Sequence, residues 1–143
     1  MKKKGLQYIA WVEGHQDWIR DLSFCQDAMT GDVLLASASS DTFIRLWRIA
    51  RKESMEVEVA GSVQEAESRQ KIVFVARDHG GNVPMFSVSL DALFVGHSHF
   101  VHSVCWSADG RHVVSASMDK TMIVWEKDAE EGVWIDRFRV GGN

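Results

Sequence analysis

The sequence has few of the features that mark specialised classes of protein. Its two cysteines, Cys25 and Cys105, form no CxxC pair, so neither a disulfide framework nor a zinc or redox site is indicated. Both are expected to be small buried hydrophobic residues. No apolar run approaches the roughly 20 residues of a membrane-spanning helix, and no signal-like apolar segment follows the basic residues 2–4. These absences predict an intracellular protein with no membrane partner.

Basic charge is scarce as well. Lysine and arginine total 16 against 20 aspartates and glutamates, which gives a net charge of −4. Binding to phosphates needs a concentrated lysine and arginine surface, so this balance argues against nucleic acid as the main partner. The rest of the composition, with 45% hydrophobic and 25% charged residues, is that of an ordinary globular domain. At 143 residues the chain has the usual size of one domain.

What the sequence does contain is a stretch that occurs twice. Each copy opens on Gly-His, continues through Ser-Ala-Ser-x-Asp, and closes on a tryptophan six residues after the aspartate. The copies begin at Gly14 and Gly96 and end at Trp47 and Trp125. One turn is shorter in the second copy. An internal repeat is stronger evidence for an architecture than any single motif.

The repeated units are predicted to consist of β-strands. Their apolar residues alternate with period two and are β-branched or aromatic, which suits a pleated surface. Strands are expected at residues 18–24, 33–39, 43–48 and 86–95 in the first unit, and at 101–107, 112–117, 121–126 and 133–140 in the second. Residues 8–12 are interpreted as the last strand of a preceding unit. The predicted organisation is therefore residues 1–13 from that unit, 14–95 as the first repeat and 96–143 as the second.

A long insertion interrupts the first unit at about residues 51–84. Through Gln70 it is rich in glutamate, serine and glutamine, so a mobile loop is expected there. Residues 72–76 are apolar enough to form an extra strand, and the Asp-His-Gly-Gly-Asn sequence at 78–82 predicts a turn.

The polar residues of each unit can form a closed hydrogen-bonded chain. In the first unit Asp41 would accept from the His15 imidazole, whose other nitrogen faces Ser37, and Ser37 would accept from the Trp47 indole N–H. Ser39 lies on the same strand face and could serve instead, although Ser37 is favoured. Each bond adds only about 1 kcal/mol, but a buried partner left unpaired costs roughly 1–3 kcal/mol, so the network would fix the register. The second unit offers His97, Ser115, Asp119 and Trp125.

These residues at these spacings resemble the WD-repeat family. The resemblance implies an all-β fold in which each unit is a four-stranded blade, so that the chain supplies two blades of an incomplete β-propeller. Both units depart from the Trp-Asp of the family, because Arg48 and Glu126 follow the tryptophans. The resemblance also implies a protein-binding module with no catalytic residue, cofactor or small-molecule substrate.

A wider similarity narrows this expectation. Residues 14–20, 35–41, 115–125 and 132–134 are similar to WD-repeat subunits of a complex that modifies wobble uridines in transfer RNA. That similarity implies a scaffold with other protein subunits as partners, in the cytoplasm and nucleus, with acetyl transfer in another subunit and nucleic acid contacted only indirectly. Two alternatives stay open. One is another WD-repeat adaptor, such as a ubiquitin-ligase receptor or assembly factor, and the other is a surface that binds transfer RNA, which a narrow band of lysine and arginine would favour.

The repeats also contain residue types that are typical of two other chemistries. A Ser/His/Asp set is typical of hydrolases, but the duplication argues against catalysis and neither unit has a Gly-x-Ser-x-Gly elbow. His97, His99, His102 and Cys105 are residue types that bind zinc. Strand residues three apart point to opposite faces, so these side chains would not converge. No catalytic or metal site is predicted.

The large aromatic residues divide into two groups. Trp18, Phe24, Phe100 and Trp106 are expected in the core between blades, because a platform for stacking bases would also need basic neighbours. Trp11 and Trp134 lie on predicted outer strands, where they are candidates for edge or partner contacts. The full set of candidate partner-binding residues adds positions at the predicted rim and comprises Trp11, Trp18, Arg20, His99, Phe100 and Trp134.

Overall fold

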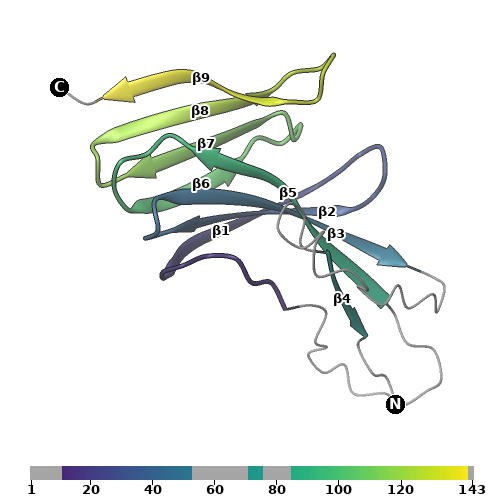
Figure 1. The fold of residues 1–143 in the computed structure, drawn as a ribbon. Helices are drawn as coiled ribbons and strands as arrows, with labels where there is room; N and C mark the ends of the chain where they lie inside the picture. Colours follow the sequence, from purple (N-terminus) through teal and green to yellow (C-terminus); the bar gives the residue numbers. More distant parts are fainter. Residues whose placement is uncertain (1–10, 53–70, 76–84, 142–143) are drawn as a thin grey trace, which may run out of the picture.

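The computed structural model describes residues 11–52, 71–75 and 85–141, and its regular elements are β-strands arranged in two antiparallel sheets (Figure 1). The first sheet has the strand order β1-β2-β3-β5-β4 and the second has the order β6-β7-β8-β9. Within these ranges no helix could reach across a membrane. The all-β architecture predicted from the period-two pattern is confirmed.

The strands of the first sheet are β1 (Ile19–Gln26), β2 (Val33–Ser39), β3 (Phe43–Lys52), β4 (Lys71–Val75) and β5 (Met85–Val95). Those of the second sheet are β6 (Val101–Trp106), β7 (His112–Ser117), β8 (Thr121–Lys127) and β9 (Trp134–Gly141). β2 and β7 have the predicted bounds. β3 is longer than predicted because its last residues pair with the start of β5, where Lys52 lies opposite Met85.

The first sheet has one strand more than the four of the second. β4 pairs antiparallel with β5 and accounts for the apolar run at 72–76 that predicted an extra strand. The remainder of the predicted insertion, at 53–70 and 76–84, lies outside the described residues. So do residues 8–10 of the strand predicted at 8–12, whereas Trp11 and Val12 are described and belong to no strand.

The same turn joins the second and third strands of both units. Thr42 and Lys120 occupy equivalent positions and have positive φ angles of 77° and 69°. The preceding aspartate holds each turn, since Asp41 Oδ1 accepts from the Phe43 N–H and Asp119 Oδ1 accepts from the Thr121 N–H. The turn therefore places one carboxylate of each unit at the same point beside the strands.

The two sheets pack on one another, with β1 against β6, and share one hydrophobic core (Figure 1). Polar bonds tie the two strands together, because Val104 N–H donates to Asp21 Oδ2 at 3.0 Å and the Trp106 indole N–H donates to the Ser23 carbonyl at 3.1 Å. The buried side chains of this core are Leu34, Ala36, Ala38, Ile44, Leu46 and Phe94 of the first sheet and Val101, Val104, Trp106, Val113, Ile123 and Trp125 of the second.

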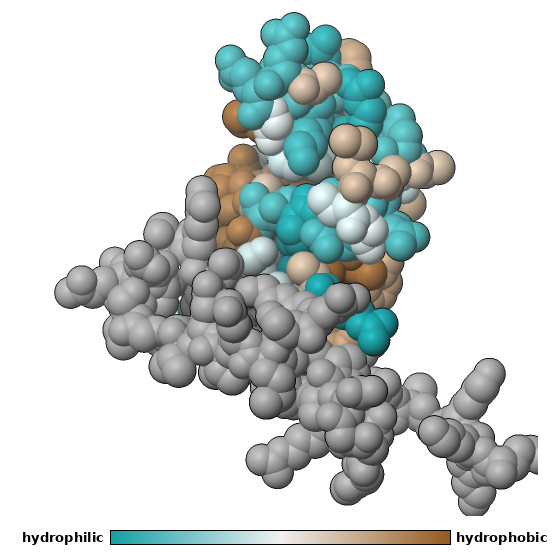
Figure 2. Space-filling view, turned by 90° about the vertical axis from the view of Figure 1, so that its right-hand side faces the viewer, coloured by the Kyte–Doolittle hydropathy of each residue, from teal (hydrophilic) through white to brown (hydrophobic). Residues whose placement is uncertain are grey.

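Equivalent residues of β1 and β6 have opposite environments. Phe24 pairs with Leu35 as Trp106 pairs with Val113, so the two aromatics hold the same position in the repeat. Trp106 is 9% exposed because its side lies against the first sheet, whereas Phe24 is 64% exposed because no described sheet covers its side. The prediction that Phe24 lies in the core between blades is wrong for the described chain. Hydrophobic surface also reaches solvent in patches on the face shown in Figure 2 (brown).

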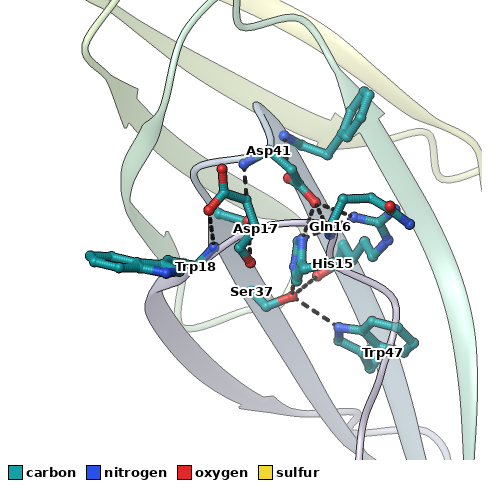
Figure 3. A network of polar contacts seen from close by, with 10 residues as sticks. His15, Gln16, Asp17, Trp18, Ser37, Asp41 and Trp47 are labelled. Atoms are coloured by element: carbon teal, nitrogen blue, oxygen red, sulfur yellow. Dashed lines mark hydrogen bonds and ion pairs between the residues drawn. The ribbon is translucent and has the colours of Figure 1, made fainter.

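Two further predictions about single residues need correction. Trp18 was expected in the core but is exposed, since it precedes β1 and projects away from the strands (Figure 3). Cys105 was expected to be buried and is also exposed. Its neighbours Val104 and Trp106 face the first sheet, so alternation along β6 turns Cys105 outward. Cys25 is half-buried and packs at the edge of the shared core.

Candidate functional site

The first unit contains the hydrogen-bonded chain that its residue types suggested (Figure 3). His15 precedes β1, Ser37 lies in β2, Asp41 lies in the turn after β2, and Trp47 lies in β3. The His15 Nδ1 is 2.9 Å from Asp41 Oδ2, and its Nε2 is 2.6 Å from Ser37 Oγ. The Trp47 indole N–H donates to Ser37 Oγ at 2.9 Å. Ser37 fills the bridging position, while the Ser39 hydroxyl accepts from the Asp41 N–H.

The second unit repeats this geometry closely. His97 Nδ1 lies 2.9 Å from Asp119 Oδ2, and its Nε2 lies 2.7 Å from Ser115 Oγ. The Trp125 indole N–H donates to Ser115 Oγ at 2.9 Å. We call the two sets the His15 network and the His97 network. Each joins the segment before the first strand to the second and third strands, so it fixes how one unit's strands lie in register.

The glycine before each histidine is required by close packing. A Cβ atom at Gly14 would lie 2.7 Å from the Trp47 ring, and one at Gly96 would lie 2.8 Å from the Trp125 ring. Contacts this short force neighbouring atoms to move, and here the neighbours are buried indole rings. The Gly-His pair is therefore a packing unit, in which glycine gives the tryptophan room and histidine closes the hydrogen-bonded chain.

Burial and hydrogen bonds determine the protonation states of the histidine and the aspartate in the His15 network. Burial lowers the pKa of His15 below its ordinary value, although hydrogen bonding to Asp41 works in the opposite direction. Burial would raise the pKa of Asp41, but hydrogen bonds from the Gln16 and Phe43 N–H groups and from His15 hold it below its usual range. Since an ionised carboxylate only accepts, the contact between His15 and Asp41 is a hydrogen bond when Nδ1 carries the proton, and in that tautomer Ser37 donates to Nε2.

Asp119 in the second unit is held in the same state by equivalent partners and by one further donor, the Thr121 hydroxyl. Burial opposes ionisation, but the Thr121 hydroxyl and His97 donate to the carboxylate and lower the pKa of Asp119 far below its usual range. The Ser98 and Thr121 N–H groups add two further hydrogen bonds. Both aspartates are therefore ionised acceptors at neutral pH.

Neither network leaves its serine hydroxyl free to act as a nucleophile. The Ser37 residue is only 2% exposed, and its hydroxyl oxygen is held between the His15 ring and the Trp47 indole. Ser115 is in the same position. A hydrolase needs its serine oxygen open to a substrate carbonyl. Among the described residues, no group of three or more histidine, cysteine, aspartate or glutamate side chains is placed to hold a metal ion.

Arg45 also belongs to the His15 network. Nothing in the sequence indicated this role for Arg45. Its Nη1 donates to Asp41 Oδ2 at 3.0 Å, and its side chain is largely buried. The equivalent position of the second unit is Ile123, because Ser37 pairs with Arg45 as Ser115 pairs with Ile123. Comparing the two copies therefore gave no signal for this residue.

The departure from Trp-Asp at Arg48 is explained by a cluster of carboxylates. The Arg48 Nη1 lies 3.0 Å from both Asp27 Oδ2 and Asp32 Oδ2, and its Nε lies 3.5 Å from Asp91 Oδ1. The hydrogen bond from Arg48 also lowers the pKa of Asp27. The guanidinium thus ties the β1–β2 turn to β5. This role could not be predicted from the sequence, because the segments meet only when the strands pair.

The structure separates the six candidate partner-binding residues into three locations. Trp18, Arg20, His99 and Phe100 lie together where β1 and β6 begin. Trp11 is exposed elsewhere, with its indole N–H bonded to Glu13. The prediction that Trp134 makes edge or partner contacts is wrong. Its side chain packs against the core between the sheets, with the ring centre 5.3 Å from that of Phe94 and 5.6 Å from that of Trp106.

Two sheets with equivalent buried networks, packed face to face in series, define a pair of β-propeller blades. The WD40 family model, described as WD domain, G-beta repeat, matches residues 6–48 and 88–126, which together make up more than half of the chain. The chain belongs to the WD-repeat family.

Curated relatives extend the similarity beyond the repeats. Elongator complex protein 2 from Drosophila melanogaster is 37% identical to this chain, over 91% of this chain and 17% of its own length. The proteins of the same name from Mus musculus and Homo sapiens are 37% and 36% identical over 90% and 94% of this chain, and 16% and 17% of their own lengths. The chain spans about a sixth of the length of these relatives.

A solved structure supports the fold independently. The crystal structure of Saccharomyces cerevisiae Sqt1 superposes with a TM-score of 0.58 at 12% identity, over 94% of this chain and 26% of Sqt1. At this identity the likeness concerns the fold alone.

Proposed function

We propose that this chain is a non-catalytic scaffold element that mediates protein–protein assembly within an Elongator-type complex. The observation that carries the proposal is the similarity to Elongator complex protein 2 from several organisms over about nine tenths of the chain. The buried serines support the non-catalytic part, because Ser37 and Ser115 serve their networks and present no open nucleophile.

In this proposal the chain contributes to transfer-RNA modification indirectly, through the complex that it helps to assemble. We propose that the assembled complex supports wobble-uridine modification of transfer RNA, with the chemistry in another subunit and with this chain as structural support. The chain would work in the cytoplasm and nucleus with other protein subunits as partners. Its net charge of −4 favours protein over nucleic acid as the direct contact.

Affinity purification tests the proposal. The chain would be tagged in its natural context and purified under mild salt, and the co-purified proteins would be identified by mass spectrometry. We expect a stoichiometric set of Elongator subunits. Recovery of ubiquitin-ligase subunits or of assembly chaperones instead would contradict the proposal and favour another WD-repeat adaptor, and a complex built mainly of transfer RNA would favour a nucleic-acid surface.

The non-catalytic part has its own test. Ser37→Ala and Ser115→Ala should reduce stability and, where the protein still folds, leave the modified-uridine content of transfer RNA unchanged. The matched control is Ser103→Ala, which removes an exposed hydroxyl from β6. Loss of modification with an unchanged melting temperature in either network variant would assign chemistry to that serine. Fluorescence imaging of the tagged chain in both compartments tests the proposed location.

A further inference from the structure

An arginine lies between two aromatic rings from different blades. The Arg20 guanidinium carbon is 5.2 Å from the centre of the Trp18 ring and 5.6 Å from the centre of the Phe100 ring. We call these three residues the arginine stack. Trp18 and Phe100 hold the same position in the two repeats, because the residues that follow them, Ile19 and Val101, pair with Ser39 and Ser117. The stack therefore bridges consecutive blades.

Backbone hydrogen bonds hold the two residues that carry the rings, and a neighbouring side chain packs on one of the rings. The Trp18 carbonyl accepts from the Ser40 N–H at 2.8 Å, and the Phe100 carbonyl accepts from the Met118 N–H at 2.9 Å. The His99 ring packs edge-on against Phe100 with 4.6 Å between ring centres. Trp18 nevertheless remains 72% exposed, so one of the two rings presents a large apolar surface to solvent.

The guanidinium is held by one edge. Its Nε donates to the Ser40 hydroxyl at 2.6 Å, and Ser40 is buried. Among the described residues, no hydrogen bond or ion pair occupies the two terminal amino groups, and Arg20 is exposed. A guanidinium oriented in this way presents a planar pair of donors, which matches a carboxylate in bidentate geometry.

We propose that the arginine stack binds a carboxylate of an acidic peptide segment on a partner protein. The carboxylate would accept from the two terminal amino groups of Arg20, and an apolar part of the same segment would cover the Trp18 ring. Because Ser40 and the two rings already hold the guanidinium, binding would order few side chains. This assignment rests on the proposed scaffold function and names the chemistry of one of its contacts.

The small number of basic groups at the stack favours a peptide over a nucleic acid. Asp17 lies directly before Trp18 and accepts from the Trp18 N–H, so its negative charge opposes every anion alike and the number of cationic donors decides between them. A nucleic-acid backbone is bound by several lysines and arginines that contact successive phosphates. The arginine stack offers a single fork in a chain of net charge −4, which suits one carboxylate.

Titration calorimetry with the 143-residue chain tests the inference. The probe would be an acetylated and amidated Glu-Glu-Leu-Glu-Glu peptide, compared with its Gln-Gln-Leu-Gln-Gln counterpart and with an oligouridylate of similar length. We expect the glutamate peptide to bind, and the glutamine peptide to bind at least about tenfold more weakly because the charge-assisted bonds are lost.

Variants then assign the binding to the stack. Arg20→Gln should lower the affinity for the glutamate peptide by about tenfold or more. Arg20→Lys should have an affinity between those of the parent and Arg20→Gln, because lysine keeps the charge but lacks the pair of planar donors. The matched control is Arg111→Gln, an exposed arginine with no side-chain bond among the described residues, which should bind like the parent. Near-ultraviolet circular dichroism would show that each variant is folded.

Three outcomes would overturn the inference. They are equal binding of the two peptides, an unchanged affinity in folded Arg20→Gln, and tighter binding of the oligouridylate than of the glutamate peptide. These results are separable from the scaffold proposal, because Elongator subunits could still co-purify with the chain through another surface. Conversely, peptide binding at the stack without co-purification would leave the carboxylate site standing and refute the scaffold assignment.

Discussion

Replacing Ser37 by alanine removes the atom on which the His15 network converges. The variant leaves the Trp47 indole N–H and the His15 Nε2 without the hydroxyl that pairs them, and both side chains are almost fully buried. Each unpaired buried group costs about 1–3 kcal/mol. We therefore expect Ser37→Ala to lower the free energy of unfolding by about 2–4 kcal/mol, which is large for the loss of one oxygen atom.

Urea denaturation at pH 7.5 measures this loss, in a stabilising osmolyte that raises the marginal stability of the isolated chain enough for the transition to be fitted, and with the denaturant slope checked to be unchanged. Ser103→Ala serves as the control, since its exposed hydroxyl has no bond among the described residues, and should change stability by less than about 0.5 kcal/mol. A double-mutant cycle with Trp47→Phe isolates the indole bond and should give a coupling of about 1 kcal/mol. A Ser37→Ala loss no larger than that of the control, or strictly additive effects in the cycle, would refute the reasoning.

Three other perturbations follow from the same geometry. Gly96→Ala should destabilise by about 1–3 kcal/mol in urea unfolding, because its Cβ would meet the Trp125 ring at 2.8 Å. Trp134→Ala should cost about 3 kcal/mol in the same assay, since the ring packs against the core between the sheets. Lowering the pH should reduce stability from about pH 6.5 downward: His15 has a lowered pKa when folded, so the unfolded chain binds the proton more readily. Unfolding measured between pH 5 and 7.5 should show a slope that His15→Gln reduces.

Each of these expectations has a contrary result. Unchanged stability in Gly96→Ala would show that the tryptophan shifts at no cost. A loss below about 1 kcal/mol for Trp134→Ala would return that residue to the free outer edge that the sequence suggested. A pH slope as steep in His15→Gln as in the parent would assign the titration to other groups.

The sequence predicted the strands and the networks well because their signals are local or repeated. Period-two alternation needs only a few adjacent residues, and it located each strand of both units between residues 18 and 141. The networks were predictable because two copies carry the same four residue types at matching spacings. Ser37 could be preferred over Ser39, and the structure has Ser37 in the bridging position.

Contacts between distant segments could not be predicted in this way. Arg48 meets Asp27, Asp32 and Asp91, which lie 16 to 43 residues away. In the second unit the pair equivalent to Arg48 and Asp91 is Glu126 and Arg137, with the charges exchanged, so comparing the two copies does not predict the cluster. Trp134 was assigned to an edge because β9 is an outer strand, whereas its ring turns inward onto Phe94 of the other sheet. The exposure of a side chain such as Phe24 depends on what lies over its sheet, and no local pattern encodes that.

We infer that the chain supplies two blades whose exposed faces are covered by further blades in a complete propeller. Phe24 illustrates this, because its equivalent Trp106 is buried against the neighbouring sheet. On the opposite side of the pair, Phe138 and Val140 of β9 are likewise exposed. Repeat proteins need about three units before contacts between neighbours outweigh chain entropy, so the isolated chain should be marginally stable and should associate through these faces.

Light scattering across a concentration series, combined with chemical denaturation, tests that claim most directly. We predict a mass above that of the monomer that rises with concentration, a shallow unfolding transition, and a lower mass for Phe24→Glu, which places a charge on the free face. The exposed control Arg111→Gln should keep the parent's mass. A monodisperse monomer of 16.1 kDa with a cooperative transition and several kcal/mol of stability would contradict the account.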